Sequence, residues 1–279
     1  MIENAHLLEA SGQLTGVITL PEQADTTLPA LIMLNAGFLH HIGPYRLHTL
    51  LARDVASQGF VSLRFDLGGV GDSPDSPNTQ ADANLQAVQD VQNAMDFLQR
   101  EHGVSRFVVM GLCSGADDAF DVAVADQRVD GALMIDGHGY RTRRFYVNHA
   151  FVHFGRRLLS WQKWRVLLAR LSRNRAPNEA SRSQELDDRI RLDTSKSTVQ
   201  EAMRRLSARG CQQRFIYTGG VSDYYNYEGQ FDDCFGADAQ LPGVSHRWFP
   251  DSDHLFMLAR HREALRQDVI QWLRESYLS

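Results

Sequence analysis

A short motif around a cysteine constrains this chain more than any other feature. A strand-like run, FVVM at 107–110, leads directly into GLCSG at 111–115. The spacing G-x-Cys-x-G between a strand and a helix places the central side chain on a sharp turn, so the residues two positions away must be small. Gly111 and Gly115 meet that requirement, and the N-terminus of the following helix favours a negatively charged thiolate. The motif predicts that Cys113 is a nucleophile.

Two other interpretations of the motif stay open at this point. If Ser114 were the nucleophile, its flanking positions would be Leu112 and Ala116, and Leu112 is too bulky for that role. Alternatively, Cys113 is a small buried hydrophobe, which is the commonest fate of a free cysteine. The two glycines and the strand-to-helix context favour Cys113 as nucleophile over both.

Strand-like and helical patterns alternate through the rest of the chain. Strands are expected at 6–10, 14–20, 28–34, 60–65, 106–110, 131–135, 214–218 and 246–249, and helices at 45–58, 81–101, 198–210 and 262–278. Such alternation after an opening hairpin predicts a mostly parallel eight-stranded sheet with helices on both faces. No strand pattern occurs between 139 and 197. We therefore expect a core of residues 1–138 and 198–279, with residues 139–197 inserted after the sixth strand as a helical lid.

Composition excludes several classes of protein. The 279 residues are 43% hydrophobic, and a chain of this size buries enough surface to fold without disulfides. The sequence has no apolar run of membrane-spanning length, no signal peptide at the start, and no CxxC spacing among its three cysteines. We expect a cytoplasmic protein with reduced thiols and no metal site. The net charge of −5 argues against nucleic-acid binding, and the absence of phosphate-binding glycine motifs predicts no cofactor.

Three segments together resemble the α/β-hydrolase superfamily. These are the motif around Cys113, the D-x-x-G-x-G-x-S pattern at 66–73, and Asp253-His254 between the last strand and the last helix. A cysteine in the first motif is similar to dienelactone hydrolases and polyhydroxyalkanoate synthases. The amino-acid sequence of residues 35–46, 63–73 and 111–116 is most similar to that of exosortase-associated hydrolase-like proteins of bacteria. Genome context links those proteins to exopolysaccharide and surface assembly. The resemblance implies the α/β-hydrolase fold, with the catalytic residues in the order nucleophile, acid, histidine.

The histidine and the acid are sought downstream of Cys113 in that order. His254 lies just after the last strand and before the last helix, so it is the predicted base. For the acid we prefer Asp223, which follows the glycine turn that ends the strand at 214–218. Asp136, at the end of the strand at 131–135, is the alternative. The acid would hold the imidazole in the required tautomer and stabilise the imidazolium.

An oxyanion hole requires two backbone N–H groups. One is expected from Ser114, the residue after the nucleophile, and the other from Gly37 or Phe38 in the loop after the third strand. The same loop continues into a segment rich in polar rings, which either lines the substrate pocket or lies in solvent. The candidates for substrate contact in this segment are His40, His41 and Arg46.

The expected lid is strongly basic. Residues 139–176 contain nine arginines and Lys163 with no acidic residue, interleaved with aromatic side chains. A basic helix of this kind is typical of an element that binds a membrane surface or an anionic partner. We expect an acidic acyl carrier protein, an anionic substrate or an anionic membrane surface as its partner. The alternative is a lid whose arginines pair with acidic residues elsewhere in the chain.

These features predict an enzyme that transfers acyl groups through a Cys-His-Asp triad. The leading hypothesis is hydrolysis of an ester or thioester through an acyl-cysteine intermediate. An acyltransferase that passes the acyl group to an alcohol or amine uses the same residues. A binding protein that kept the fold without activity is the second alternative, because fold alone does not establish activity.

Overall fold

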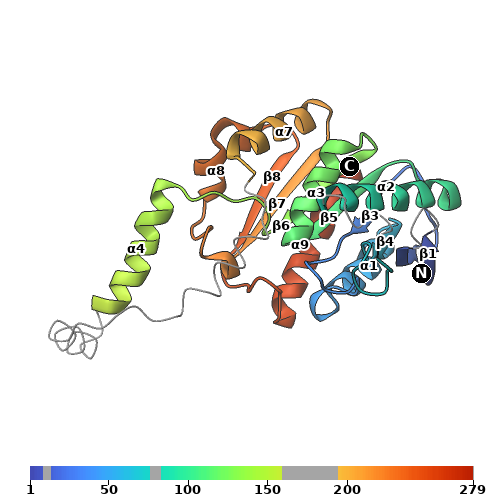
Figure 1. Cartoon of the computed structure of the whole chain (residues 1–279), viewed down its shortest axis with the longest axis horizontal. Helices are drawn as coiled ribbons and strands as arrows, with labels where there is room; N and C mark the ends of the chain where they lie inside the picture. Colours follow the sequence, from blue (N-terminus) through green and yellow to red (C-terminus); the bar gives the residue numbers. More distant parts are fainter. Residues whose placement is uncertain (9–13, 76–82, 159–193, 279) are drawn as a thin grey trace.

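The computed structural model describes residues 1–8, 14–75, 83–158 and 194–278, and one twisted sheet runs through the molecule (Figure 1). Its strands are β1 (Ile2–Leu8), β2 (Leu14–Leu20), β3 (Ala30–Met33), β4 (Ser62–Phe65), β5 (Phe107–Leu112), β6 (Val129–Ile135), β7 (Gln212–Thr218) and β8 (Val244–Phe249). The α-helices are α1 (Leu47–Ser57), α2 (Ala83–His102), α3 (Ser114–Ala125), α4 (Arg143–Leu158), α7 (Lys196–Ala208), α8 (Gln230–Phe235) and α9 (Ala259–Tyr277).

The strand order confirms the predicted architecture. The eight strands lie in the order β1-β2-β4-β3-β5-β6-β7-β8. The pairs β1–β2 and β2–β4 are antiparallel, whereas every pair from β4 to β8 is parallel. This is the α/β-hydrolase fold, with β5 and its following turn near the centre of the sheet. Because the carboxyl ends of parallel strands share one edge, the loops after β3, β5, β6, β7 and β8 all meet there.

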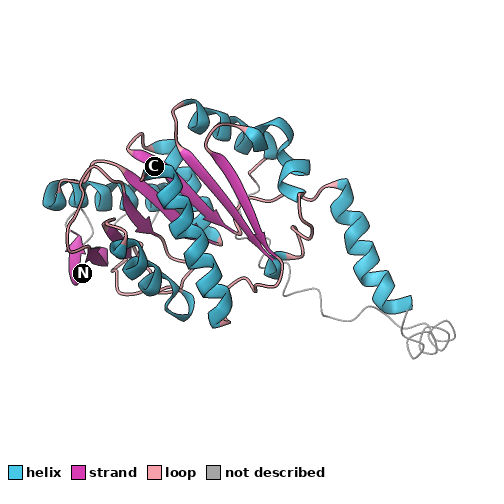
Figure 2. Ribbon diagram, turned by 180° about the vertical axis from the view of Figure 1, so that it is seen from behind, coloured by secondary structure: helices cyan, strands magenta, loops and turns pink. Residues whose placement is uncertain are grey.

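Helices cover both faces of the sheet (Figure 2). Residues of α1 and α9, such as Leu51 and Val269, pack in one buried cluster against one face. Residues of α2, α3 and α7, such as Met95, Phe120 and Met203, pack in a second cluster against the other face. The central strands β3, β4 and β5 are buried throughout, which explains their continuous apolar runs.

The start of α7 differs in detail from the sequence expectation. The pattern at Thr198 and Glu201 predicted a capping box beginning at Thr198. In the structure α7 begins at Lys196 and the Ser195 side chain accepts a hydrogen bond from the Thr198 N–H at 3.2 Å. Serine is an equally good N-cap and lies three residues earlier, so the helix gains almost one more turn.

The segment expected to form the lid is described only in part. Residues 143–158 form α4, a helix as expected, and it projects away from the sheet (Figure 1). Residues 159–193, with the remaining basic positions, lie outside the described residues. The boundaries 139–197 and the covering role of a lid therefore stay predictions. Among the helices that the structure describes, none has the length and apolar character needed to cross a membrane.

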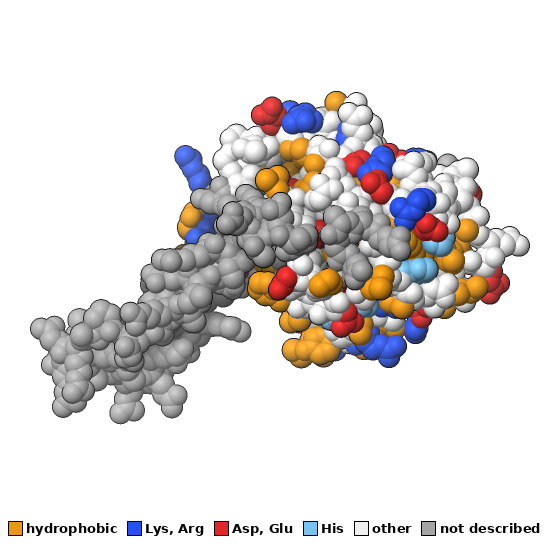
Figure 3. All heavy atoms as spheres, turned by 45° about the vertical axis from the view of Figure 1, so that its right-hand side comes forward, with side chains coloured by type: hydrophobic (Ala, Val, Ile, Leu, Met, Phe, Trp, Pro, Cys, Tyr) orange, Lys and Arg blue, Asp and Glu red, His pale blue; other side chains and the backbone are white. Residues whose placement is uncertain are grey.

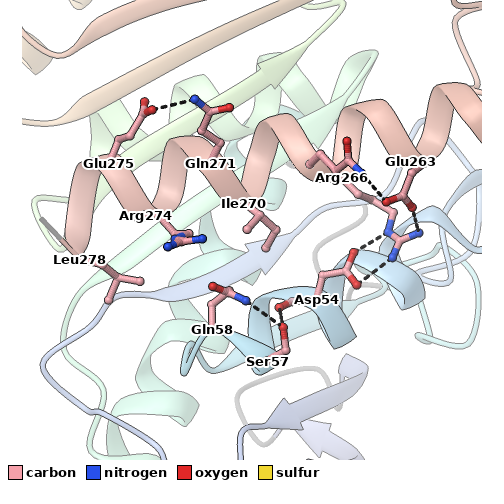
Figure 4. Close-up of a pocket in the computed structure, with 11 residues that line it drawn as sticks. Asp54, Ser57, Gln58, Glu263, Arg266, Ile270, Gln271, Arg274, Glu275 and Leu278 are labelled. Atoms are coloured by element: carbon pink, nitrogen blue, oxygen red, sulfur yellow. Dashed lines mark hydrogen bonds and ion pairs between the residues drawn. The ribbon is translucent and has the colours of Figure 1, made fainter.

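An open groove lies between α1 and α9 (Figure 4). Most of the residues that line it are polar, and Arg266 of α9 bridges to Asp54 of α1 with Nη2 and Oδ1 2.7 Å apart. Glu263 accepts a second hydrogen bond from the same guanidinium at 2.8 Å. The groove marks the contact between two helices on one face of the sheet. None of the residues that line it is predicted to be catalytic.

Candidate active site

Cys113 lies on a strained turn between β5 and α3. Its backbone has φ 61° and ψ −126°, a conformation that costs an L-residue about 1–3 kcal/mol. The turn is tight enough that a Cβ atom on Gly111 would collide with the carbonyl oxygen of Gly115, and one on Gly115 would collide with that of Asn35. These contacts explain why both positions flanking Cys113 are glycine. Cys113, and not Ser114, occupies the strained position.

His254 contacts the Cys113 side chain from the loop between β8 and α9. Its imidazole forms a side-chain hydrogen bond with Cys113, while its Nδ1 lies 2.8 Å from Oδ2 of Asp136. The three residues come from the carboxyl ends of β5, β6 and β8, which the parallel sheet brings to one edge. The imidazole therefore bridges the thiol and a carboxylate.

Asp136 is held rigidly at the end of β6. It is completely buried and has φ 53°. Its Oδ1 accepts the Thr218 N–H at 2.7 Å, and its Oδ2 accepts the Thr218 hydroxyl at 2.7 Å. Because a buried carboxyl group is costly unless hydrogen-bonded, these donors offset the cost of its burial and fix its orientation toward His254. Sequence analysis did not identify Thr218, which ends β7.

The preferred sequence prediction for the acid, Asp223, is not the residue beside His254. After β7 the chain forms a short 3-10 turn, Gly219–Val221, in which the Gly220 N–H donates to Ser252 O at 3.1 Å. This turn packs against the His254 loop and carries Asp223 onward to an exposed position. There its backbone oxygen accepts a hydrogen bond from Arg141 Nε at 2.8 Å. The alternative, Asp136, takes the place next to the imidazole.

The environment of His254 favours its protonated form. Burial acts to lower the pKa of the imidazole, but hydrogen bonds to Asp136 and Cys113 and their charges outweigh it and raise the pKa from 6.5 to about 10. A pKa this high means that the imidazolium persists at neutral pH beside the cysteine sulfur. The arrangement is suited to an ion pair of thiolate and imidazolium, the form in which a cysteine attacks a carbonyl carbon.

The loop after β3 passes beside the tight turn at residues 111–115 that carries Cys113, which we call the elbow. The oxyanion prediction requires this proximity. Gly37 has φ 57°, and a Cβ atom on it would lie 4.0 Å from Ser114 Oγ. Gly37 therefore lies beside the Ser114 side chain, and these are two of the positions named as donors. The Phe38 side chain is 86% exposed, so any contribution from Phe38 to an oxyanion hole comes from its backbone N–H.

Asp66, at the end of β4, holds this loop in shape. Its buried Oδ1 accepts the Asn35 side-chain N–H at 2.7 Å and the His41 backbone N–H at 2.6 Å. Its Oδ2 lies 2.6 Å from His41 Nδ1 and accepts the Asp72 N–H at 3.1 Å. Burial acts to raise the pKa of Asp66, but these hydrogen bonds from His41, Asp72 and Asn35 outweigh it and lower the pKa. The carboxylate thus ties both ends of the segment that contains Gly37.

The three residues named as candidates for substrate contact lie in different environments. His41 is buried against Asp66, His40 is partly exposed with Nε2 2.9 Å from Asp72 Oδ2, and Arg46 is exposed at φ 65°. His41 therefore has a structural partner, while His40 and Arg46 stay candidates for substrate contact.

Two of these rings and two carboxylates also satisfy the spacing of a metal site. Ligand atoms of His40, His41, Asp66 and Asp72 lie within 4.8 Å of one another, the one such group in the described part of the chain. However, His40 Nδ1 accepts the Ile42 N–H at 3.2 Å, which leaves Nε2 as the protonated nitrogen facing Asp72. Both oxygens of the Asp66 carboxylate likewise already have hydrogen-bond partners. Hydrogen bonding therefore explains the cluster, and we assign no metal to it.

Replacing Asp66 should separate the oxyanion loop from the nucleophile. We expect Asp66→Asn to lower kcat/KM for an acyl substrate about 100-fold, the cost of losing one oxyanion donor. Alkylation of Cys113 by iodoacetamide should stay within about twofold, because direct displacement by a thiolate needs no oxyanion hole. Both rates are measured on the same preparation. Equal losses in the two rates would show that Asp66 acts on the thiolate or on the fold instead.

The other two cysteines are buried and unsuited to catalysis. Burial raises the pKa of Cys211 to about 11 and also raises the pKa of Cys234. Neither thiol therefore ionises near neutral pH. They serve as internal controls for labelling experiments on Cys113.

Comparison with known proteins agrees with this architecture. A family described as serine aminopeptidase, S33 matches residues 27–210, which include the elbow and Asp136. A search of the curated proteins finds no match. Among solved structures, the α/β hydrolase GrgF from Penicillium sp. sh18 is 15% identical with a TM-score of 0.57, over 100% of this chain and 99% of that chain.

Two further structures show the same fold at similar distance. The thioesterase domain from the curacin biosynthetic pathway is 12% identical with a TM-score of 0.58, over 97% of this chain and 100% of that chain. Carboxylesterase CesB from Bacillus subtilis is 14% identical with a TM-score of 0.56, over 98% and 92%. The family model covers well over half of the sequence, and the sheet and the elbow have the form that the fold requires. The chain therefore belongs to the serine aminopeptidase (S33) family of α/β hydrolases and is an enzyme of that class.

Proposed function

We propose that this protein hydrolyses an ester or thioester through an acyl-cysteine intermediate on Cys113, with His254 as acid–base and Asp136 as the orienting carboxylate. One observation carries the proposal: the His254 imidazole joins the Cys113 side chain to a fully buried carboxylate. This is the geometry of an activated nucleophile, with the base oriented by a third group. The family is named for a serine nucleophile, so a cysteine at the elbow is a departure that the experiments below address.

The reaction divides into two steps. The Cys113 thiolate attacks the acyl carbonyl carbon, a C–S bond forms, and backbone N–H groups of Ser114 and of Gly37 or Phe38 stabilise the oxyanion. The bond to the leaving alcohol or thiol then breaks, and the His254 imidazolium supplies its proton. In the second step neutral His254 takes a proton from water, the resulting hydroxide attacks the thioester, and the C–S bond breaks to regenerate the thiolate and release the acid.

The acceptor in the second step decides between hydrolase and acyltransferase. Two structural neighbours are described as a carboxylesterase and a thioesterase domain, which supports ester and thioester substrates here. The alternative is an acyltransferase that passes the acyl group to an alcohol or amine in a biosynthetic pathway, which a lid that excludes water would favour. Turnover of an acyl thioester with added alcohol or amine tests the choice, because a new ester or amide among the products requires transfer. The third hypothesis, a binding protein without activity, would gain if His254 did not approach Cys113; the hydrogen bond between the two side chains supports the catalytic proposal instead.

The nucleophile itself is tested by trapping. Brief mixing with an excess of acyl thioester, followed by acid quench and mass spectrometry of the intact protein, should show one added acyl group that maps to Cys113. Hydroxylamine should release it, as expected for a thioester. Failure of Cys113 to acylate in a preparation that turns over substrate would rule out the covalent route through this residue.

The raised pKa of His254 predicts the pH dependence of labelling. Because the pKa is raised from 6.5 to about 10, the imidazolium that favours the thiolate is fully present below pH 6.5 and is lost only as the pH rises through about 10. The iodoacetamide rate at Cys113 should therefore be nearly constant between about pH 6.5 and 9, whereas an ordinary thiol of pKa about 8.5 slows roughly tenfold per unit below that value. The same pairing stabilises the folded state below pH 10 and not above it.

Replacement of the imidazole supplies the control for that profile. In His254→Ala the labelling of Cys113 should recover the profile of an ordinary thiol, slow at pH 7 and rising toward pH 9. Cys211 and Cys234 should stay unlabelled in both folded proteins because both are buried. A wild-type profile indistinguishable from that of His254→Ala would contradict the ion pair.

A further inference from the structure

Large apolar side chains are exposed on two loops beside the candidate site. Phe38 is 86% exposed and Leu39 41% exposed beside the predicted oxyanion donor. On the other side, Met257 and Leu258 are 54% and 42% exposed just after His254. We call these four residues the apolar rim. Both of its segments follow carboxyl ends of parallel strands, β3 and β8, and so flank Cys113 at the end of β5.

The rim lies on one side of the molecule. In Figure 1 the loop after β3 and the start of α9 both lie at the lower edge, and Figure 3 shows hydrophobic side chains gathered along that edge. Asp253 accepts the backbone N–H groups of Leu255 and Met257 at 3.0 Å and 3.1 Å. The rim segment near His254 is therefore held outward by hydrogen bonds of its own loop.

Helix α4 presents a second set of exposed apolar side chains. Its first turn is anchored: Phe145 is buried, and its carbonyl accepts a hydrogen bond from Asn226 Nδ2 at 3.2 Å. Nearby on the helix, Tyr146, Val147 and Phe151 are 59%, 53% and 74% exposed. Val147 and Phe151 are four residues apart and so share one face of the helix.

The sequence that contains α4 carries charged residues of one sign. Arg141, Arg143 and Arg144 are exposed at the start of α4, and no acidic residue occurs from 139 to 176. A helix that exposes aromatic and aliphatic side chains beside arginines is typical of an element lying in the interface of a bilayer. An anionic bilayer surface attracts arginines and accepts the aromatic rings, whereas an acidic protein would satisfy the charge alone.

We propose that the carboxyl edge of the sheet docks on a bilayer that contains anionic lipids, with the Val147–Phe151 face of α4 and the apolar rim both in contact with it. Docking in this position turns the edge of the sheet that carries Cys113 toward the membrane. The consequence for substrate rests on the proposed function: the acyl donor would be a lipid ester or thioester that enters from the bilayer.

Vesicle flotation tests the docking without any assay of activity. Wild type should float with vesicles of phosphatidylcholine and phosphatidylglycerol and far less with phosphatidylcholine alone, and added salt should weaken the binding. Val147→Ser combined with Phe151→Ser should lower the partition coefficient at least about tenfold, since each side chain contributes roughly 1.5–3 kcal/mol when fully buried. Leu7→Ser is the matched control, because Leu7 is 58% exposed on β1 at the opposite end of the sheet.

Each outcome of this experiment bears on the proposal. Binding that is equal for the two lipid mixtures, or that is unchanged in the α4 double variant, overturns it. So does retention on an immobilised acidic acyl carrier protein together with no flotation. Hydrolysis of a short water-soluble ester should be the same in wild type and the double variant, whereas hydrolysis of a long-chain ester in vesicles should fall in the variant. If wild type hydrolysed neither ester, the proposed function would be refuted, but the flotation result would still test the docking.

Discussion

Asp136→Asn should reduce kcat/KM about 10⁴-fold, while Asp223→Asn should change it less than about twofold. The first value is the effect of converting the triad carboxylate to an amide, which presents the wrong tautomer of the imidazole to the nucleophile. In this structure the amide would also place an N–H donor against either the Thr218 N–H or His254 Nδ1, since both oxygens of Asp136 are engaged. Asp223 is exposed and touches its neighbours through its backbone oxygen, so the amide there should have little effect.

Asp136→Asn and Asp223→Asn make the same chemical change at two different positions. Steady-state kinetics with one acyl thioester gives the comparison, and thermal unfolding shows how much of any loss is structural. We expect Asp136→Asn to lose about 1–3 kcal/mol of stability, because a buried donor is left facing another donor. The labelling rate of Cys113 should fall in this variant as well. A large loss in Asp223→Asn with near-normal kinetics in Asp136→Asn would assign the acid role to Asp223 and require a different conformation of the loop after β7.

Cys113→Ala should abolish measurable turnover, a loss on the order of 10⁶-fold, as found when a triad nucleophile is removed. Without the sulfur no covalent intermediate forms, and the remaining oxyanion donors act on water alone. Cys113→Ser keeps the elbow and the contact with His254 but substitutes a hydroxyl that does not ionise near neutral pH. We expect its activity to fall between that of wild type and that of Cys113→Ala, and iodoacetamide should no longer label position 113.

Ser114→Ala is the control for that experiment. Ser114 is predicted to contribute its backbone N–H, which the alanine variant retains, so kcat/KM should stay within about tenfold of wild type. The rates are measured by product release and the acylated residue by peptide mapping. If Ser114→Ala removes activity and Cys113→Ala does not, serine is the nucleophile and the register of the elbow has been misassigned.

Local sequence features were sufficient to predict the fold and the elbow. The continuous apolar runs of β3 to β6 reflect strands buried on both faces, and the two glycines around Cys113 are required by backbone contacts that only glycine tolerates. His254 was placed correctly in the loop after β8 because that loop is short and contains one histidine. In each case the physical cause lies within a few residues of the signal.

The acid and the loop scaffold depend on contacts between distant segments, and these were harder to predict. Asp136 and Asp223 both follow a strand and both could point toward the site edge. What separates them is the 3-10 turn after β7, whose hydrogen bond to Ser252 is not encoded in the local pattern. The role of Asp66 was likewise missed, because its partner Asn35 is 31 residues away in sequence. The signal that could have identified Asp136 is a carboxylate directly after an apolar strand and before a glycine.

The order of the strands has a consequence for the newly made chain. β8 is the last strand to be synthesised and lies at the edge of the sheet, where it pairs with β7. His254 follows β8, so the imidazole reaches Cys113 only after the final strand has left the ribosome and docked. Until then the elbow can form on β5 and α3, but its thiol lacks the imidazole partner that the proposed mechanism requires. The proposed pair of thiolate and imidazolium therefore forms only after β8 has docked, although the nucleophile itself is synthesised well before.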